Sequence, residues 1–470
     1  MTDFIIEDIG SIINGGLSYK GEKKPLISPV TGKEWGKIAN ATPEEVEQAL
    51  ETVQKNPVIR IPPYGRAQIL ELLAIDLLKE KEDIAECITM EMGKPKPDAR
   101  GEVTYAANYF KWYAEEIKRV YGKIIPSSKH TKKLEVRYEP IGPCAVITPW
   151  NFPIAMAARK FAAAFAAGCP VIIKPSSFSP ASLVMFATIC FEVGIPDYAF
   201  QVLIGEGKDI VPALMDSPAI KQFSFTGSTK IGTDLYVRGA KMLKKCTLEL
   251  GGNAPFIVFE DADITLAAKG AADAKFRMSG QTCICANRIF VHKSVEKEFV
   301  QKFSEIVMGM IAGDPRQEET ELSNVLHPES LRKSEDHVKD AIEKGAKAIL
   351  GRKEPHLAEI LTGVTPDMKI FNEETFGPIA PIITFEKEQE VIDLANQTPF
   401  GLAAYVYTEG LKRAERVTNA LEYGVIGLND ALPSSPEASF GGIKASGFGR
   451  EGGPTGIYEY LHEKFVSQQL

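Results

Sequence analysis

Long hydrophobic runs and a basic excess are both missing from this sequence. Its most apolar stretch, residues 161–171, is far shorter than the roughly 20 residues of a membrane-spanning helix, and we interpret it as a buried helix. The net charge of −8 argues against a general binder of nucleic-acid phosphates. The first residues, which include Asp3, Glu7 and Asp8, lack the basic start and apolar core of a secretory signal. We therefore expect a cytoplasmic protein that binds neither a membrane nor nucleic acid.

Disulfide and metal-binding patterns are also missing. The seven cysteines are odd in number and scattered, which suits a reducing compartment better than a disulfide scaffold. The six histidines have no metal-ligand spacing, so we expect no metal site. At 470 residues the chain exceeds the roughly 250 to 300 residues at which one hydrophobic core stops growing, which predicts at least two packed lobes.

Short β-rich segments alternate with helical patterns from residue 142 onward. The predicted strands are 144–148, 171–174, 200–204 and 222–225, and the predicted helices between them are 154–167, 180–193 and 208–215. Such alternation predicts a parallel sheet built from βαβ units. A second series, with strands at 254–259 and 288–291 and an Ala-rich helix at 264–278, predicts a second α/β lobe.

Two further segments frame these series. Residues 43–100 have helical patterning that opens with a capping box, Thr42 and Glu45, and is divided by Pro62 and Pro63. Residues 121–138 are polar, Lys-rich and extended, and they fit neither series. Composition leaves two interpretations of that segment open, an arm that crosses to another subunit and a surface loop.

Three side chains are candidates for chemistry. Cys283 lies between a predicted helix and a predicted strand, where a loop can present a thiol to a cleft, although a buried, inert cysteine has the same appearance. Glu249 stands alone among apolar residues before paired glycines, a setting that raises the pKa of a carboxyl; a capping or ion-paired glutamate is the alternative. Asn151 lies between a strand and a helix, where its amide either donates to an oxyanion or forms a turn.

Polar residues at strand ends indicate a ligand site. Lys174 ends one predicted strand, and Gly227 and Ser228 follow another, so we expect all three at the carboxyl edge of the sheet, where ligands bind in such folds. The dinucleotide fingerprint itself is reduced to a fragment, Gly205-Glu206-Gly207, which is too short to indicate a cofactor.

Seven motifs occur in the order found in the aldehyde dehydrogenase superfamily, which the sequence resembles over essentially its whole length. They are PWNFP at 149–153, KPS at 174–176, FTGST at 225–229, ELGG at 249–252, GQTCICANR at 280–288, EETFGP at 373–378 and FGGIKASGFGRE at 440–451. CICANR and the C-terminal block are most similar to NADP-preferring succinic semialdehyde dehydrogenases.

The resemblance implies an α/β fold with two Rossmann-like parallel-sheet lobes and a small β oligomerisation arm. It implies a cofactor-binding domain at 1–121 and 140–248 and a catalytic domain at 249–425. The arm is implied at 122–139 and 457–470, in a homodimer or homotetramer.

The same resemblance assigns roles to individual residues. Cys283 is the nucleophile, Glu249 the general base, and Asn151 an oxyanion donor alongside the Cys283 backbone N–H; the aldehyde passes through a thiohemiacetal and a thioester to the acid. The positions that correspond to cofactor contacts are Trp150, Lys174, Pro175, Ser176, Ser177, Gly205, Gly227, Ser228, Leu250, Glu374 and Phe376. For Gly227 and Phe376 a purely structural role is the strongest alternative to cofactor contact: the glycine suits a turn and the phenylalanine a core position.

The predictions of coenzyme preference and substrate class depend on fewer residues. Ser177 stands where NAD-preferring relatives often have a glutamate whose charge repels a 2′-phosphate, so with Lys174 nearby we expect NADP, with NAD also usable. Arg159, Arg277 and Ser434 match positions that bind the far carboxylate of succinic semialdehyde, unless the two arginines form structural ion pairs. The alternatives are glutarate semialdehyde, a broad range of aldehydes, and a catalytically silent homologue.

Cys285 has two interpretations. Some relatives with this CxC arrangement form an inactivating disulfide, which here would join Cys283 and Cys285 and would need a rearranged loop. An inert small residue is the alternative.

Overall fold

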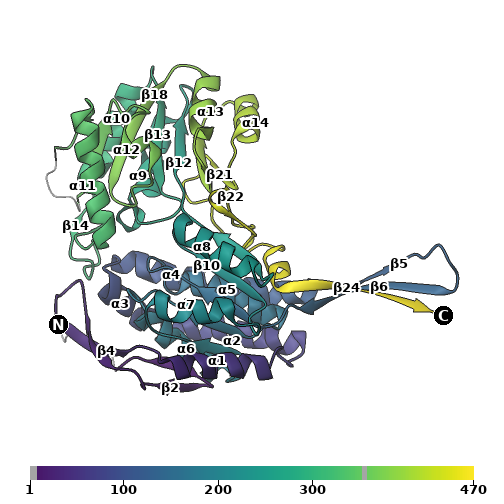
Figure 1. Cartoon of the computed structure of the whole chain (residues 1–470). Helices are drawn as coiled ribbons and strands as arrows, with labels where there is room; N and C mark the ends of the chain where they lie inside the picture. The colour runs from purple at the N-terminus through teal and green to yellow at the C-terminus, as the bar shows by residue number, and fades with distance from the viewer. Residues whose placement is uncertain (1–7, 352–356) are drawn as a thin grey trace.

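The computed structural model describes residues 8–351 and 357–470, folded as two α/β lobes with a narrow arm projecting from the lower one (Figure 1). Residues 1–7, on which most of the argument about a secretory signal rests, lie outside the described part. No helix among the described residues is long and apolar enough to cross a membrane.

The first lobe is built around an eight-stranded sheet in the order β2-β1-β9-β8-β7-β10-β11-β23. Its strands are β1 (Ser11–Ile13), β2 (Gly16–Ser18), β7 (Cys144–Ile147), β8 (Val171–Lys174), β9 (Phe200–Val202), β10 (Gln222–Thr226), β11 (Lys245–Glu249) and β23 (Gly447–Phe448). The five central strands, β9 to β11 in that order, are parallel. The direction of strand progression reverses between β7 and β10, and such a switch point opens a crevice at the carboxyl edge of the sheet.

Helices cover both faces of this sheet. They are α1 (Pro43–Lys55), α2 (Pro63–Lys79), α3 (Lys81–Met92), α4 (Lys96–Glu116), α5 (Ala155–Ala167), α6 (Ala181–Glu192), α7 (Gly207–Asp216) and α8 (Thr229–Ala240). Successive β7 residues point to opposite faces, so Val146 packs with α2 to α6 while Ala145 packs with α1, α7 and α8. A hairpin of β3 (Lys23–Ile27) and β4 (Glu34–Ala39) lies near the N-terminus.

The second lobe has a seven-stranded sheet in the order β16-β17-β18-β13-β12-β20-β21. The strands are β12 (Ala254–Val258), β13 (Ala286–His292), β16 (Lys347–Ala348), β17 (Glu359–Thr362), β18 (Ile379–Phe385), β20 (Ala403–Tyr407) and β21 (Val425–Leu428). The helices are α9 (Ile264–Phe276), α10 (Glu296–Gly309), α11 (Pro328–Glu343), α12 (Lys369–Asn372), α13 (Glu388–Asn396) and α14 (Leu411–Ala420). Every pairing except β16 with β17 is parallel, so the predicted second α/β lobe is present.

The arm is a three-stranded antiparallel sheet that extends away from both lobes (Figure 1). It consists of β5 (Lys123–Ile125), β6 (Lys132–Pro140) and β24 (Leu461–Gln469). Strand β24 pairs with β6 along its whole length, from Leu461 opposite Pro140 to Gln469 opposite Lys132. The Lys-rich segment is therefore a β-arm that incorporates the C-terminal strand, and not an irregular surface loop.

The local predictions match closely in the first lobe. The capping box is present, since Thr42 Oγ1 accepts the Glu45 N–H and Glu45 Oε2 accepts the Thr42 N–H. One prediction was wrong in part: residues 161–171 are not a single buried helix, because α5 ends at Ala167 and β8 begins at Val171. Gly168, in the left-handed conformation, ends the helix and turns the chain into the strand.

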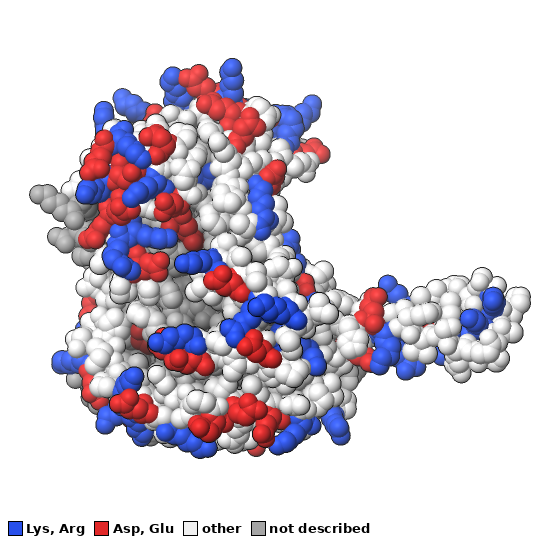
Figure 2. All heavy atoms as spheres, in the orientation of Figure 1, with Lys and Arg blue, Asp and Glu red and all other residues white. Residues whose placement is uncertain are grey.

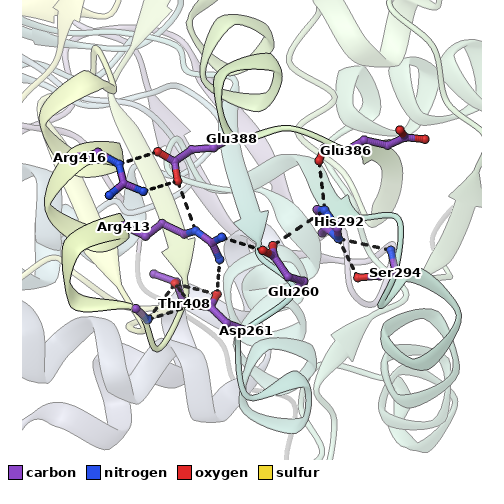
Figure 3. A network of polar contacts seen from close by, with 10 residues as sticks. Glu260, Asp261, His292, Ser294, Glu386, Glu388, Thr408, Arg413 and Arg416 are labelled. Atoms are coloured by element: carbon purple, nitrogen blue, oxygen red, sulfur yellow. Dashed lines mark hydrogen bonds and ion pairs between the residues drawn. The ribbon is translucent and has the colours of Figure 1, made fainter.

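Charged side chains form a network of ion pairs and hydrogen bonds at the carboxyl edge of the second sheet (Figure 3). Arg413 on α14 donates to Asp261 at 2.6 Å and to Glu260 at 2.7 Å, both just after β12. Its Nε also contacts Glu388, which begins α13, at 3.3 Å. These groups neutralise one another at the carboxyl edge, whereas Cys283 precedes β13 and therefore lies at the opposite, amino edge.

The two lobes meet across a hollow on the face drawn in Figure 2, where Lys and Arg side chains alternate with Asp and Glu. The carboxyl edge of the first sheet and the amino edge of the second converge at this junction, because Asn151 follows β7 and Cys283 precedes β13. This convergence brings together residues that lie far apart in the sequence.

Candidate active site

Cys283 lies in a tight loop between α9 and β13. The predicted helix 264–278 ends earlier, at Phe276, because Arg277 has an extended ψ of 131° and both Met278 and Ser279 adopt left-handed φ values of 52° and 56°. The Asp98 carboxylate accepts the Met278 N–H at 3.1 Å and holds this turn. The prediction that Arg277 lies on the helix was therefore wrong, since Arg277 is the residue that ends it.

The Cys283 backbone is packed tightly against the glycine pair that follows Glu249. A Cβ at Gly252 would lie 2.6 Å from the Cys283 carbonyl oxygen, which no side chain tolerates. The second glycine of ELGG therefore permits the close approach of the two segments. The Cys283 backbone N–H has no hydrogen-bond partner within residues 8–351 and 357–470.

Asn151 connects the first lobe to the Cys283 loop. Its amide Nδ2 donates to the Gln281 carbonyl at 2.9 Å. Gln281 in turn accepts the His327 backbone N–H through Oε1 at 2.9 Å, so the loop is also tied to the start of α11. The second amide hydrogen of Asn151 has no partner in the described part of the chain, as expected of a donor directed at a ligand.

Glu249 is the last residue of β11 and is buried, with 3% of its surface exposed. Neither carboxylate oxygen has a hydrogen-bond partner among the described residues. Burial, followed by the charge of Glu451, raises the pKa of Glu249 well above the usual range. A buried carboxyl in this state is suited to accept a proton near neutral pH.

The thiol of Cys283 is only partly exposed. Its pKa is raised to about 12, mainly by burial; the charge of Arg159 opposes this rise, and the charges of Glu249 and Glu374 contribute to it. The resting thiol is therefore protonated at neutral pH and needs a base to become a nucleophile.

A cavity of about 290 Å³ opens beside Cys283. Both lobes contribute to its wall, with Phe152, Met156 and Phe440 among the apolar groups. The three residues predicted to bind a substrate carboxylate, Arg159, Arg277 and Ser434, all line it.

The Arg159 guanidinium already pairs with a carboxylate. Its Nε donates to Glu451 Oε2 at 2.5 Å, and its guanidinium lies 4.4 Å from the centre of the Phe440 ring. Lys160 contacts the other oxygen of Glu451, and all three charged groups are buried. The structural ion pair weighed for this arginine is present, although Arg159 still borders the cavity.

Arg277 and Ser434 are placed differently. Arg277 has no ion pair or hydrogen bond within the described ranges, so its guanidinium is available to a ligand. Ser434 Oγ lies 2.6 Å from the Tyr105 hydroxyl, which itself lies 2.9 Å from the Tyr109 hydroxyl. Tyr105 also lines the cavity.

A second group of predicted residues lies on the other side of Cys283. Lys174 ends β8 and is buried, yet its amine has no partner in the described chain; burial lowers its pKa to about 8. Glu374 Oε1 accepts the Gly252 N–H at 3.2 Å, and burial raises the pKa of Glu374 to about 7. The rings of Trp150 and Phe376 meet edge to face with centres 5.9 Å apart.

Four other predicted cofactor positions have clear local roles. Ser228 caps α8, Ser176 Oγ accepts the Phe178 N–H at 3.2 Å, and Leu250 packs in the core. A Cβ at Gly227 would lie 2.5 Å from the Phe225 ring, which agrees with the turn alternative. Pro175 and Ser177 follow Lys174 in the same loop, and Gly205, with φ of 146°, lies between β9 and α7.

Sequence reasoning missed several residues here. Glu451 was quoted in the last motif but given no role, and Tyr105 was not considered. Lys160 was given no role. Glu451 lies 292 positions from Arg159, so no spacing pattern indicated their pairing. Among the described residues, no group of three His, Cys, Asp or Glu side chains is arranged to hold a metal ion.

Comparisons with known proteins agree with this fold. The sequence profile of the aldehyde dehydrogenase family matches residues 18–466, and the chain belongs to that family. A 3-sulfolactaldehyde dehydrogenase from Pseudomonas putida is 42% identical over 95% of this chain and 93% of its own length.

Two further proteins similar to this chain are succinate-semialdehyde dehydrogenases. The NADP(+) succinate-semialdehyde dehydrogenase of Escherichia coli K12 is 41% identical, over 97% of each chain. The crystal structure of succinate-semialdehyde dehydrogenase from Burkholderia pseudomallei superposes with a TM-score of 0.96 at 40% identity, over 100% of this chain and 99% of that one. The predicted family, the oxidoreductase activity and the two-lobed fold with its β-arm are thus confirmed.

Proposed function

We propose that this enzyme oxidises succinic semialdehyde, or a similar acidic semialdehyde, to the corresponding acid with NADP. The observation that carries the proposal is that Cys283, the unpaired Arg277 and the Ser434 hydroxyl line one cavity. A nucleophile for the aldehyde and a cation for the far end of the substrate therefore share one chamber. The names of the related enzymes from Escherichia coli and Burkholderia pseudomallei support the same substrate.

Catalysis is assigned to three side chains. Glu249 takes the Cys283 proton, and the thiolate attacks the aldehyde carbon to give a thiohemiacetal. The free amide hydrogen of Asn151 and the free Cys283 N–H donate to the oxyanion. Bound NADP supplies the hydride acceptor. Once Glu249 has passed that first proton to solvent, it removes a proton from water, which attacks the carbonyl carbon of the Cys283 thioester. The C–S bond then breaks, and the acid and the Cys283 thiolate are released.

The coenzyme is assigned to the first lobe, where the residues after β8 and β10 suit a dinucleotide. The buried, unpartnered Lys174 amine fits a ribose hydroxyl or a 2′-phosphate, and Glu374 can accept from a ribose hydroxyl. Ser177 adds no negative charge there, which favours NADP. Glu206, however, lies near enough to raise the pKa of Lys174, and its carboxylate favours NAD as the second candidate.

The substrate's far carboxylate is assigned mainly to Arg277, with Ser434 and Tyr105 as hydroxyl donors. A guanidinium binds a carboxylate through charge-assisted hydrogen bonds. Arg159 is a secondary contact, because Glu451 already neutralises it. Glutarate semialdehyde is the nearest alternative. The similarity to the sulfolactaldehyde enzyme adds a sulfonate tail as a related possibility.

The oligomeric state and the location follow from other features. The arm exposes apolar side chains, with Ile124 74% and Phe465 61% exposed, so we assign it to subunit contacts in a homodimer or homotetramer. A cytoplasmic location agrees with the seven cysteines, all of which are free thiols.

Initial-rate assays test the proposal. The purified enzyme is given succinic semialdehyde, glutarate semialdehyde or hexanal, each with NADP or NAD, and the absorbance of the reduced coenzyme is followed. Turnover that is fastest with succinic semialdehyde and NADP, and is absent in Cys283→Ala, is the expected result. Equal rates on hexanal would remove the role given to Arg277 and leave a general aldehyde dehydrogenase. No turnover on any aldehyde would favour the catalytically silent alternative.

A further inference from the structure

Lys275 is a buried lysine without a carboxylate partner. It lies in the last turn of α9, is fully buried, and has no ion pair in residues 8–351 and 357–470. Among the described residues, the other two fully buried lysines are Lys94 and Lys160, and each faces a carboxylate, of Glu102 and Glu451 respectively. Burial lowers the pKa of Lys275 although the charges of Cys285 and Glu374 favour the ammonium, so the unprotonated amine is accessible.

The group that faces this amine is the Cys285 thiol. Lys275 Nζ lies 3.4 Å from Cys285 Sγ, and its only other hydrogen bond within the described part of the chain is to Asn287 Oδ1 at 3.2 Å. Cys285 Sγ also donates to the Lys275 backbone carbonyl at 3.4 Å, which fixes the sulfur between two atoms of the same residue. A nitrogen and a sulfur nucleophile are thus held in contact, and the catalytic roles proposed above use neither.

We propose that Lys275 and Cys285 form a covalent nitrogen–sulfur crosslink when the enzyme meets hydrogen peroxide. In the first step the sulfur attacks one peroxide oxygen, the O–O bond breaks, and Cys285 becomes a sulfenic acid with release of water. In the second step the unprotonated Lys275 amine attacks that sulfur. The N–S bond forms, the S–O bond breaks, and the hydroxide leaves with the amine proton as a second water.

The overall reaction joins one thiol, one amine and one peroxide to give one sulfenamide and two waters. Two thiols of a reductant reverse it, restoring the amine and the Cys285 thiol as the reductant becomes a disulfide. Peroxide is nearly as small as water, and Ile284, the neighbour of Cys285, lines the cavity through which it would arrive.

The geometry favours Lys275 over Cys283 as the partner of an oxidised Cys285. Cys283 and Cys285 are two positions apart, and a disulfide between them requires the loop to rearrange. The Lys275 amine already touches the sulfur. The crosslink would tie the end of α9 to the far side of the Cys283 loop and span the strained Met278–Ser279 turn.

Peptide mapping of the Cys283→Ala enzyme tests this directly, because the Cys283–Cys285 disulfide cannot form in that variant. The folded protein is treated with peroxide, its remaining thiols are alkylated, and it is digested with trypsin. A crosslinked Lys275 resists cleavage, so the expected product joins residues 270–277 to residues 278–288. Its mass is that of the two peptides less two hydrogen atoms, and prior treatment with dithiothreitol abolishes it.

Two matched variants serve as controls in the same Cys283→Ala background. Cys285→Ser should give no crosslinked product. Lys275→Arg keeps a cation but has no amine that attacks sulfur readily, so Cys285 should carry added oxygen instead. The proposal is overturned if peroxide leaves Cys285 fully alkylatable, or if the oxidised sulfur remains uncrosslinked while Lys275 is cleaved normally. Because the main result comes from a chain that retains Lys275, it stands even where Lys275→Arg fails to fold.

Discussion

The Asn151 amide donates to the Gln281 carbonyl at 2.9 Å and so joins the carboxyl edge of the first sheet to the loop that carries Cys283. One amide hydrogen holds the loop, and the other is left for a ligand. Positioning and chemistry therefore depend on the same side chain, which makes its substitution informative.

Replacing Asn151 by Ala should lower kcat by about 100- to 1000-fold, the usual effect of losing one oxyanion donor. Steady-state assays with saturating semialdehyde and coenzyme measure it. Asn396→Ala is the matched control, because its amide also donates to a backbone carbonyl, that of Ala420 at 2.9 Å, but neither residue lines the cavity beside Cys283. An unchanged kcat in Asn151→Ala would remove the oxyanion role.

The pH dependence of kcat should report the raised pKa of Glu249. The base acts in its ionised form, and burial holds the proton on Glu249 to higher pH than on an ordinary glutamate. The rate should therefore fall as the pH is lowered through that raised pKa, above the usual value of about 4.3.

Variants separate this carboxyl from its neighbour. Glu249→Gln should lose about 100- to 10000-fold in kcat and also lose the acid limb of the profile. Glu374, whose pKa is raised to about 7, is the control, and Glu374→Gln should keep the limb. If the acid limb disappears only in Glu374→Gln, the group that titrates is Glu374, and the assignment to Glu249 is wrong.

Arg277 and Arg159 should respond differently to substitution. Arg277→Gln should reduce kcat/KM for succinic semialdehyde by about 10- to 100-fold, since hydrogen bonds to a charged group contribute about 1.5–3 kcal/mol, and leave butanal unaffected. Arg159→Met removes a partner of the buried Glu451 and should lower the free energy of unfolding by about 3 kcal/mol or more. Denaturant titration and kinetics on both aldehydes measure these effects. Equal losses on the two aldehydes in Arg277→Gln would contradict carboxylate recognition.

Coenzyme choice should depend on charge around Lys174. Ser177→Glu should weaken the binding of NADP more than that of NAD. It would add a second carboxylate, besides that of Glu206, near the buried Lys174 amine, and this charge repels a 2′-phosphate. Glu206→Gln should act in the opposite sense and improve the use of NADP. The ratio of kcat/KM for the two coenzymes measures both effects. If neither substitution changes that ratio, the 2′-position is recognised elsewhere.

The arm should control assembly. Phe465→Lys places a charge on an exposed apolar position of β24 and should shift the enzyme toward monomers in analytical ultracentrifugation. Leu411→Lys is the control, since Leu411 is 82% exposed but lies at the start of α14, away from the arm. Unchanged sedimentation of Phe465→Lys would place the subunit contacts outside this part of the arm.

The sequence alone predicted the parts of the molecule that depend on local pattern. The Thr42 capping box, the alternating strands and helices around β7 to β10, and the Cys283 loop all follow from neighbours within a few positions, because caps and amphipathic periods are short-range. The motif order was enough to indicate the family, which the comparisons confirmed.

Only the tertiary structure determined which charged side chains are paired within the protein and which are available to a ligand. Arg159 and Arg277 look equivalent in the sequence, yet packing pairs the first with Glu451 and leaves the second without a hydrogen bond or ion pair among the described residues. The Tyr105–Ser434 contact and the Lys275–Cys285 contact likewise depend on where the chain folds back. A buried charge is stable only beside a partner of opposite charge, and the packing of both lobes determines which residue that partner is. Local spacing in the sequence does not contain this information.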